Sequence, residues 1–397
     1  MQGIVVTAER ETPGRALRVL HVQKAHGLGG SERHIVDLAR ALRPQGCEAG
    51  VLWLEAPGHP LDALAAFTRE NGVPVARLPI RGHLDPGLPR RMAAFLRRDP
   101  PDLLHLHLIH ATLHGVLAAR GRDAPRLIAS RHGVEPYRRL PWFGLLQRRL
   151  DRRCQRILVP SEHLARFTRR WDGTAPAKMR VVPHGLPPEC FAPADAAARA
   201  ATRAAWGVRA EEVVLGAVAR LHPSKDHATL LRAFAQALRR HPALRLILVG
   251  EGPLRGRLEA LARELLGDAA PAHVLFLGEQ VVDRGLYAGL DVAVQATRRE
   301  GFGLAALEAM AAGLPLVASR VGALPEIVQP EETGLLVEAG SVSALAAALE
   351  RLAADPALRV ALGARAHRAA QAYTVERMAR AVGAVYREVV TAGPGPG

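Results

Sequence analysis

The chain has 397 residues, of which 49% are hydrophobic and 23% charged, and its 53 Lys and Arg side chains exceed its 38 Asp and Glu side chains by 15. This length and apolar content predict two domains, each with its own core, and exclude both a small isolated module and a disordered chain. Residues 1–190 hold 30 basic and 17 acidic side chains. The charge surplus therefore belongs almost wholly to the first half of the chain.

The three cysteines, Cys47, Cys154 and Cys190, have neither paired nor metal-type spacing, which favours free thiols in a reducing compartment. Residues 1–14 contain no apolar run of signal-peptide length, and no later run reaches the roughly 20 apolar residues of a membrane span. The sequence therefore predicts a cytoplasmic protein, with peripheral attachment to the inner face of the plasma membrane left open.

Short apolar runs alternate with helical patterns along the chain, which is typical of parallel α/β sheets. A first series of strands is predicted at 17–22, 49–54, 73–78, 103–107, 126–130 and 157–160, and a second at 213–219, 244–249, 274–277, 291–295, 316–319 and 334–337. Two Rossmann-like, doubly wound domains follow from this pattern, at residues 1–190 and 191–373. Residues 374–397 are expected to form a C-terminal helix that crosses back to the first domain, followed by a disordered tail at 393–397.

The most informative segment is 299–322, with the sequence REGFGLAALEAMAAGLPLVASRVG. Gly301 and Gly303 predict a tight loop, and a helix is expected to begin near Leu304. The free N–H groups and the dipole of such a helix start form a phosphate cradle. Glu300 on the loop and Glu308 in the helix would repel phosphate alone, so we expect them to accept hydrogen bonds from hydroxyls beside the phosphates, as on sugars.

A second motif, RLHPSKD at 220–226, directly follows a predicted strand. Arg220 and Lys225 lie on one loop at the carboxyl edge of a parallel sheet, where folds of this class bind ligands. Lys225 is one of three lysines in a chain with 50 arginines, which suggests a requirement for a compact charge. Together the two cations could neutralise a departing diphosphate.

Three further loops with glycines each follow a predicted strand: GLGGSER at 27–33, GEGP at 250–253 and GEQV at 278–281. Glycine lets the backbone approach a ligand closely, and loops at the carboxyl edges of the strands are expected to face one cleft. Taken alone, the loop at 27–33 could also be a turn and a helix cap without a ligand.

Together these residues resemble glycosyltransferase family 4, the retaining nucleotide-sugar transferases of the GT-B fold, in which two Rossmann-like domains face a cleft. The resemblance runs from about Arg18 to Val390, and EGFGLAALEAMAAGLPLVAS is similar to the family's Glu-x7-Glu signature. It implies that the donor binds mostly in the C-terminal domain, that the acceptor approaches from the N-terminal one, and that domain closure gates the reaction.

The resemblance also implies roles for individual residues. Arg220 and Lys225 would hold the donor diphosphate, Glu300 and His132 would orient the transferred sugar, and Glu308 would bind the ribose. Gly29 and Gly30 resemble a glycine loop that closes over the diphosphate, and the amides of Phe302, Gly303 and Leu304 would lie near Glu300. Gly278 and Val281 resemble a nucleobase pocket that works largely through the backbone. Gly250 and Glu251, on the loop after another strand, complete the predicted donor-binding positions. Because Arg and Lys would replace a divalent cation, neither a metal nor a permanently bound cofactor is expected.

Two segments depart from the family's pattern. His184 in Pro183-His184-Gly185 stands where the family often has Asn, so the resemblance implies no donor contact at that position. Gln295-Ala296-Thr297 stands where Leu-Pro-Ser is usual.

The predicted activity is retaining transfer of a hexose or N-acetylhexosamine from a nucleotide diphosphate sugar, with UDP-sugar favoured on family frequency. The expected acceptor is a saccharide, lipid-linked, in envelope or exopolysaccharide synthesis. No nucleophile for a covalent intermediate is evident, so attack on the front face of the sugar is favoured. Two alternatives stay open: an NAD(P)-dependent oxidoreductase that uses residues 27–30 and Glu55, and a non-catalytic nucleotide-sugar-binding protein.

The segment Arg131 to Arg156 holds eight arginines interleaved with aromatic and leucine side chains. This composition suits an anionic membrane surface as well as a solvated helix face. No recognised nucleic-acid-binding motif accompanies the charge, so nucleic acid is not an expected partner.

Four histidines, at positions 105, 107, 110 and 114, lie close together in the sequence. They do not predict a metal site, because no carboxylate joins them and 110 and 114 lie beyond the strand that carries the other two. His107, at the end of that strand, is expected to line the cleft.

Overall fold

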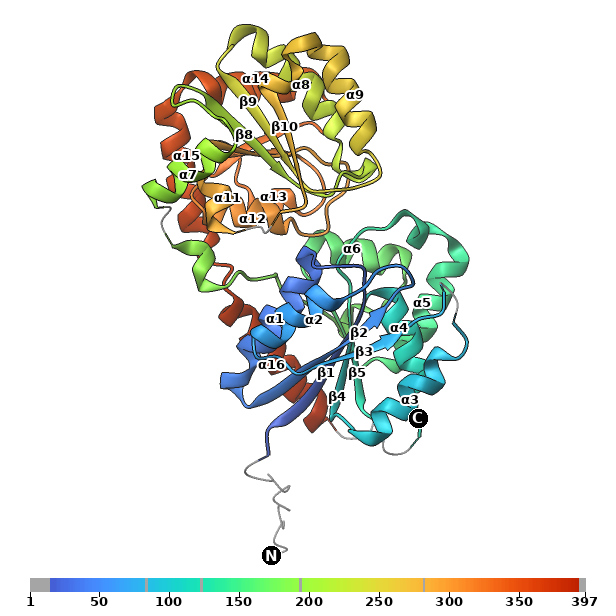
Figure 1. The fold of residues 1–397 in the computed structure, drawn as a ribbon. Helices are drawn as coiled ribbons and strands as arrows, with labels where there is room; N and C mark the ends of the chain where they lie inside the picture. Colours follow the sequence, from blue (N-terminus) through green and yellow to red (C-terminus); the bar gives the residue numbers. More distant parts are fainter. Residues whose placement is uncertain (1–14, 83–84, 122–123, 193–194, 281–282, 393–397) are drawn as a thin grey trace, which may run out of the picture. The chain divides into compact units, whose positions relative to one another are not determined.

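The computed structural model describes residues 15–82, 85–121, 124–192, 195–280 and 283–392. Two parallel sheets run through this part of the chain, as the alternating pattern predicts (Figure 1). Every strand expected from the sequence is present, and a further short strand lies at Met179–Val181 (β7). The first sheet therefore has seven strands and the second has six.

The first sheet has the strand order β3-β2-β1-β4-β5-β6-β7. Its other strands are β1 Leu17–Ala25, β2 Cys47–Glu55, β3 Val75–Pro79, β4 Leu103–His107, β5 Arg126–Ser130 and β6 Arg156–Val159. The helices that connect them are α1 Gly30–Leu42, α2 Asp62–Glu70, α3 Leu88–Arg98, α4 Leu108–Ala118, α5 Pro141–Arg153 and α6 Glu162–Trp171. All five residues of β4 are buried, as expected for a strand covered on both faces.

The second sheet has the strand order β10-β9-β8-β11-β12-β13. Its strands are β8 Val213–Val218, β9 Leu244–Val249, β10 Val274–Gly278, β11 Val292–Gln295, β12 Leu316–Ser319 and β13 Gly334–Val337. Its helices are α7 Ala196–Ala205, α8 His227–Arg240, α9 Arg255–Leu266, α10 Ala270–His273, α11 Arg284–Ala288, α12 Leu304–Ala311, α13 Leu324–Ile327, α14 Val342–Ala354 and α15 Pro356–Ala370. None of the helices in the described residues combines the length and apolar character needed to cross a bilayer.

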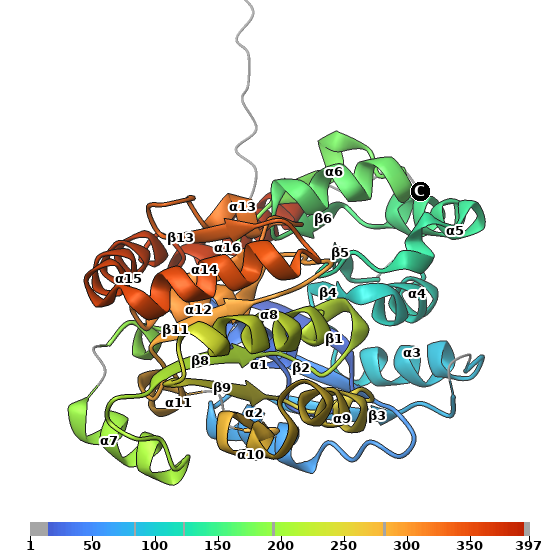
Figure 2. The same cartoon turned by 90° about the horizontal axis from the view of Figure 1, so that it is seen from above.

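Two apolar layers cover the second sheet, one on each face. The side chains of β8 alternate between them, since Leu215 packs with α8, α9 and α14 and Val214 packs with α11, α12 and α13. Figure 1 shows the two sets of helices on opposite sides of the sheet, and Figure 2 is viewed from the side of α8, α9 and α14. Because both Leu307 and Met310 of α12 are fully buried, packing holds this short helix at the end of β11.

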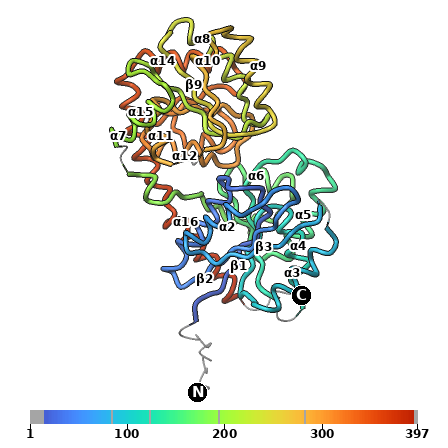
Figure 3. Tube along the Cα trace, viewed as in Figure 1, coloured from blue at the N-terminus to red at the C-terminus, as the bar shows by residue number. Residues whose placement is uncertain are grey.

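The chain divides into two compact units, one that ends at Ile128 and resumes at Gly383 and another that runs from Ala129 to Val382. The final helix, α16 Val375–Thr391, thus returns to the first unit, as predicted, and its red end lies beside the blue strands in Figure 3. The domain boundaries expected at 190 and 373 stay predictions. The tail at 393–397 lies outside the described residues.

A buried polar cluster joins α16 to the first sheet. The Tyr386 hydroxyl lies 2.6 Å from His105 Nδ1 and 3.5 Å from His21 Nε2. His21 Nδ1 in turn lies 3.0 Å from His107 Nε2. None of these four side chains belongs to a residue more than 1% exposed, and burial lowers the pKa of His21 to about 3. Hydrogen bonds among these buried side chains therefore hold the cluster together.

Acid should destabilise this fold through histidines that are buried in the neutral form. Burial lowers the pKa of His21 to about 3, and burial together with the nearby Lys225 lowers that of His227 to about 4. An unfolded histidine titrates near 6.5, so the stability these groups contribute is present above pH 6.5 and is lost as the pH falls toward 4. The loss should be about 1.4 kcal/mol per pH unit for each histidine.

The melting temperature, followed by circular dichroism from pH 7.5 to 5, should therefore fall. His227→Gln should make the decline shallower, whereas His59→Gln, at an exposed position, should leave it unchanged. A melting temperature that stays constant over this range would contradict the burial of neutral imidazoles.

Candidate active site

The loop between β11 and α12 carries the REGFG motif. Gly303 has a φ of +103° and stands at the N-cap of α12. Gly322 has a φ of +65° and packs so closely behind the loop that a Cβ there would lie 2.1 Å from the carbonyl oxygen of Glu300. Glycine is required at both positions, at Gly303 by the positive φ and at Gly322 also by the close approach. The two glycines therefore determine where Glu300 lies.

The carboxylate of Glu300 is the centre of the site. Its Oε2 accepts hydrogen bonds from the Lys225 ammonium at 2.6 Å and from the Gln295 amide at 3.0 Å, and its Oε1 accepts one from the backbone N–H of Gly301 at 3.2 Å. The side chains of Lys225 and Glu300 are 21% and 12% exposed, so water screens their attraction less than that of a surface pair. The cation predicted to bind diphosphate and the carboxylate predicted to bind sugar are thus in direct contact.

The loop that carries Lys225 is bonded to the loop that carries Glu300. The Thr297 hydroxyl and the backbone N–H of Arg298 donate to the carbonyl oxygen of Ser224 at 2.7 and 2.8 Å. Arg298 Nε also lies 3.1 Å from a carboxylate oxygen of Asp226. These contacts hold Lys225 within reach of Glu300.

Positive charge gathers beside this ion pair. Arg220 is exposed on the loop after β8, as predicted. Burial lowers the pKa of His222, and Arg220, Arg299 and Lys225 lower it further, which indicates that three cations lie near one imidazole. Such a cluster suits a diphosphate. Arg299, the first residue of the REGFG motif, was not among the predicted site residues.

The first turn of α12 supplies the expected backbone donors. The first N–H groups of an α-helix have no partner within the helix, and the N-cap residue here, Gly303, has no side chain that could cap them. Phe302, Gly303 and Leu304 lie at this helix start. One turn later, Glu308 Oε2 accepts a hydrogen bond from the Tyr287 hydroxyl at 2.8 Å. The predicted phosphate cradle and the predicted ribose-binding carboxylate are therefore on the same short helix.

The other predicted donor loops of the second sheet also meet. The backbone N–H of Gly250 donates to the carbonyl oxygen of Gly278 at 2.7 Å, and a Cβ on Gly250 would lie 2.3 Å from the carbonyl oxygen of Ala219. Glu251 follows directly and forms an ion pair with Arg255. The loops after β8, β9 and β10 therefore lie side by side at the carboxyl edge of the sheet.

His132 follows β5, and its backbone touches the Glu300 loop, because a Cβ on Gly301 would lie 2.3 Å from the His132 carbonyl oxygen. Burial, and then the charge of Arg131, lowers the pKa of His132 to about 4. The ring is therefore neutral near pH 7 and can act as a hydrogen-bonding group rather than as a cation.

His184 and Gln295 belong to this site although neither was among the predicted site residues. His184 Nε2 lies 3.4 Å from His132 Nδ1, and its ring meets the edge of Phe302 with centroids 5.0 Å apart. Gln295 donates to Glu300. Each residue departs from the family's pattern, and that departure is the sequence feature that could have pointed to a role in the site. The contacts themselves depend on residues far apart in the sequence.

The roles of three other predicted donor-binding residues stay predictions. Gly29 and Gly30 lie at the start of α1, in the other unit, and Val281 lies outside the described residues. His107, which the sequence placed in the cleft, is instead 1% exposed and bonded to His21. A side chain at the last position of β4 points into the layer that α16 covers, which explains the error.

A group of three histidines in the first unit could hold a metal ion by geometry. One ring nitrogen each of His21, His105 and His107 lies within 4.8 Å of the others. His110 and His114, which are close in the sequence, lie on α4. The hydrogen bonds to Tyr386 and between the rings already account for the buried cluster. That the reaction needs no metal stays a prediction.

The basic surface expected at 131–156 is smaller than its sequence suggests. Arg131 and Arg138 are 4% and 3% exposed and form ion pairs with Asp151 and Asp172, respectively. Arg138 also donates to the carbonyl oxygen of Gly133, beside His132. These two arginines therefore support the His132 loop, and the exposed arginines of the segment are Arg139, Arg148, Arg149, Arg152 and Arg153.

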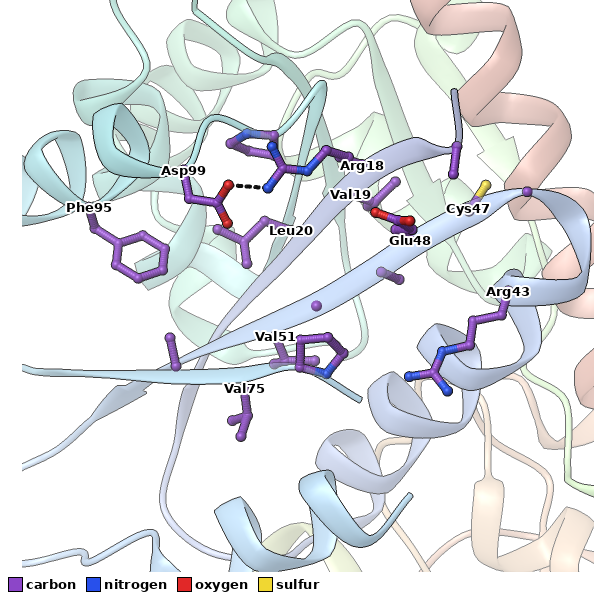
Figure 4. A pocket seen from close by; sticks show the side chains of 17 residues that line it. Arg18, Val19, Leu20, Arg43, Cys47, Glu48, Val51, Val75, Phe95 and Asp99 are labelled. Carbon is purple, nitrogen blue, oxygen red and sulfur yellow. Dashed lines mark hydrogen bonds and ion pairs between the residues drawn. The ribbon is translucent and has the colours of Figure 1, made fainter. Parts of the chain in front are cut away.

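A cavity of about 690 Å³ lies in the first unit (Figure 4). Arg18, Glu48 and Val75, near the amino ends of β1, β2 and β3, are among its lining residues, and Arg18 forms an ion pair with Asp99 across it. Doubly wound folds bind their ligands at the carboxyl ends of the strands. The cavity is therefore not the predicted donor or acceptor site.

Family models match both halves of the chain. The model described as "Glycosyl transferases group 1" matches residues 198–369, and that described as "Glycosyltransferase Family 4" matches residues 28–189. The chain is 34% identical to the D-inositol 3-phosphate glycosyltransferase of Saccharomonospora viridis, over 76% of this chain and 73% of that protein. It is 32% identical to the protein of the same name from Kribbella flavida, over 90% of each.

Solved structures show the same architecture. Anabaena Alr3699/HepE, solved in complex with UDP and glucose, is 21% identical, with a TM-score of 0.82 over 94% of this chain and 100% of that one. Sucrose-phosphate synthase from Thermosynechococcus elongatus is 25% identical, with a TM-score of 0.78 over 95% and 100%. These matches identify the fold as GT-B. The family models and the relatives set aside the oxidoreductase alternative. The chain is a glycosyltransferase and belongs to glycosyltransferase family 4.

Proposed function

We propose that the protein is a retaining glycosyltransferase that moves a hexose or N-acetylhexosamine from a UDP-sugar to a saccharide acceptor. The observation that carries the proposal is the Glu300 carboxylate held against Lys225 beside the start of α12. A carboxylate that can accept hydrogen bonds from sugar hydroxyls thus lies beside a cation suited to diphosphate and a helix start suited to phosphate, which supports the proposal. The UDP complex of a solved relative supports the choice of nucleotide.

In the proposed reaction, Arg220, Lys225 and the amides at Gly303 stabilise the charge that develops on the leaving diphosphate. Glu300 and the neutral His132 orient the sugar. Glu300 accepts three hydrogen bonds, which suits an orienting group better than a nucleophile. The acceptor oxygen therefore attacks the front face as the bond from the anomeric carbon to the phosphate oxygen breaks, and that oxygen takes the acceptor's proton. No divalent cation takes part.

Donor binding and acceptor binding are assigned to the two expected domains. Residues 191–373 bind the donor and residues 1–190 the acceptor, while α16 returns to the first domain. The acceptor is a lipid-linked saccharide at the inner face of the plasma membrane, and the protein is cytoplasmic with peripheral attachment there. D-inositol 3-phosphate is the competing acceptor, favoured by the names of the curated relatives.

Glu300→Ala and Lys225→Ala should each lower sugar transfer by about two to three orders of magnitude, because each removes a charged group that acts in the transition state. The measurement is release of UDP from UDP-sugars with each of the two acceptors, and EDTA should not change it. Glu264→Ala, at an exposed position on α9, is the matched control and should retain full activity. Normal turnover in either site variant, with the fold checked by melting temperature, would refute the site assignment.

A hydrophobic and basic face on α5 supports the membrane proposal. Trp142 is 63% exposed and Leu145 is 49% exposed. Helical spacing places Arg149 and Arg152 on the same face as these two residues. An exposed aromatic and a leucine beside arginines suit the headgroup region of an anionic bilayer.

Trp142→Ala and the double variant Arg149→Ala/Arg152→Ala should each weaken sedimentation with vesicles that contain phosphatidylglycerol, and the effect of the arginines should fade at high salt. UDP binding should be unchanged. Arg97→Ala/Arg98→Ala, which removes the same charge from exposed positions on α3, should sediment like the unaltered protein. If the unaltered protein does not bind these vesicles, the membrane proposal fails and the acceptor proposal loses its support.

A further inference from the structure

Gln295 is a buried polar residue at the end of an apolar strand. It is the last residue of β11, whose sequence is VAVQ, and it is 6% exposed and pairs with Ala318 of β12. An apolar side chain could be buried at such a position without giving up any hydrogen bonds to water. A buried amide is stable only where it finds a hydrogen-bond partner. Its amide nitrogen donates to Glu300 Oε2 at 3.0 Å, so the residue is oriented toward the site.

The donors around Glu300 are distributed unequally between its two oxygens. Oε2 accepts from both Lys225 and Gln295, whereas Oε1 accepts from the backbone N–H of Gly301 at 3.2 Å. Each carboxylate oxygen has about two lone-pair positions. Oε2 is therefore filled by the protein, and Oε1 retains capacity for a further donor, such as a sugar hydroxyl.

Lys225 alone would hold Glu300 less well during the proposed reaction. Its ammonium is also assigned to the leaving diphosphate, so its attraction is shared between two anionic groups as charge develops there. The Gln295 amide carries no net charge, so phosphate attracts it less strongly than it attracts the Lys225 ammonium. It can keep Oε2 in place while Lys225 serves the diphosphate.

We propose that Gln295 is a positioning residue that orients Glu300 so that Oε1 accepts a hydroxyl of the donor sugar. It acts through Glu300 and contacts neither the diphosphate nor the nucleotide. This inference rests on the proposed function, which supplies the sugar donor.

Gln295→Leu removes the hydrogen bond while keeping a side chain of similar size. Its kcat/KM for UDP-sugar should fall about ten- to a hundredfold, the range expected for one hydrogen bond to a charged group. Its Kd for UDP without sugar, measured by calorimetry, should stay within about twofold. Gln329→Leu, at an exposed position of the same unit, should match the unaltered protein in both measurements.

Gln295→Glu keeps the shape but can donate only when its carboxyl is protonated. Its activity relative to the unaltered enzyme at the same pH should therefore rise as the pH falls from 7.5 to 5.5, which a role in packing alone would not produce. Equal loss of UDP and UDP-sugar binding in Gln295→Leu would show a structural role and overturn the inference. So would a kcat/KM within about twofold of the unaltered enzyme.

The outcomes separate this inference from the function on which it rests. If the unaltered protein neither binds nor turns over UDP-sugars, the proposed function fails and the role of Gln295 falls with it. If the unaltered protein is active and Gln295→Leu is equally active, only the role of Gln295 is refuted.

Discussion

The second unit is organised around the ion pair between Lys225 and Glu300. The two residues come from different strand-to-helix loops, and their side chains meet at 2.6 Å in partly buried surroundings. The pair can form only because the loops are bonded to each other through Ser224 and Asp226 and because Gly322 leaves room for the backbone of Glu300. A charged pair away from water is stable only when its geometry is supported in this way. The surrounding glycines and hydrogen bonds supply that support.

The strands and the motif loops could be predicted from the sequence, because both depend on local pattern. Alternating apolar runs revealed every strand except β7, whose three residues, Met179 to Val181, are too few to give a periodic signal. Gly303 marked the start of α12 because only glycine readily adopts its left-handed backbone. The pairing of Lys225 with Glu300 could not be predicted, since 75 residues separate them and their meeting depends on how β8 and β11 lie in the sheet.

The histidines show the same limit in the first unit. The two-residue spacing along β4 puts His105 and His107 on one face, where their ring centroids lie 4.2 Å apart, but spacing could not show what covers that face. That face is covered by α16, which brings the hydroxyl of Tyr386, 281 residues away in the sequence, to the His105 ring. A residue predicted to face ligand is instead part of a buried hydrogen-bonded cluster. Polar residues in a strand therefore indicate that a partner exists, and tertiary structure decides whether it is a substrate or another part of the chain.

The basic surplus of the first 190 residues has more than one physical meaning. Arg131 and Arg138 are buried with Asp151 and Asp172, and each needs its carboxylate because an unpaired buried guanidinium would be strongly destabilising. They hold the segment from which His132 emerges. The exposed arginines of α5, beside Trp142, have no such role in the core and remain available to an anionic surface.

The site in the second unit, by contrast, combines few cations with the carboxylates of Glu300 and Glu308. Such a balance favours a ligand with both phosphates and hydroxyls, because a uniformly basic site would not distinguish a nucleotide sugar from any other polyanion.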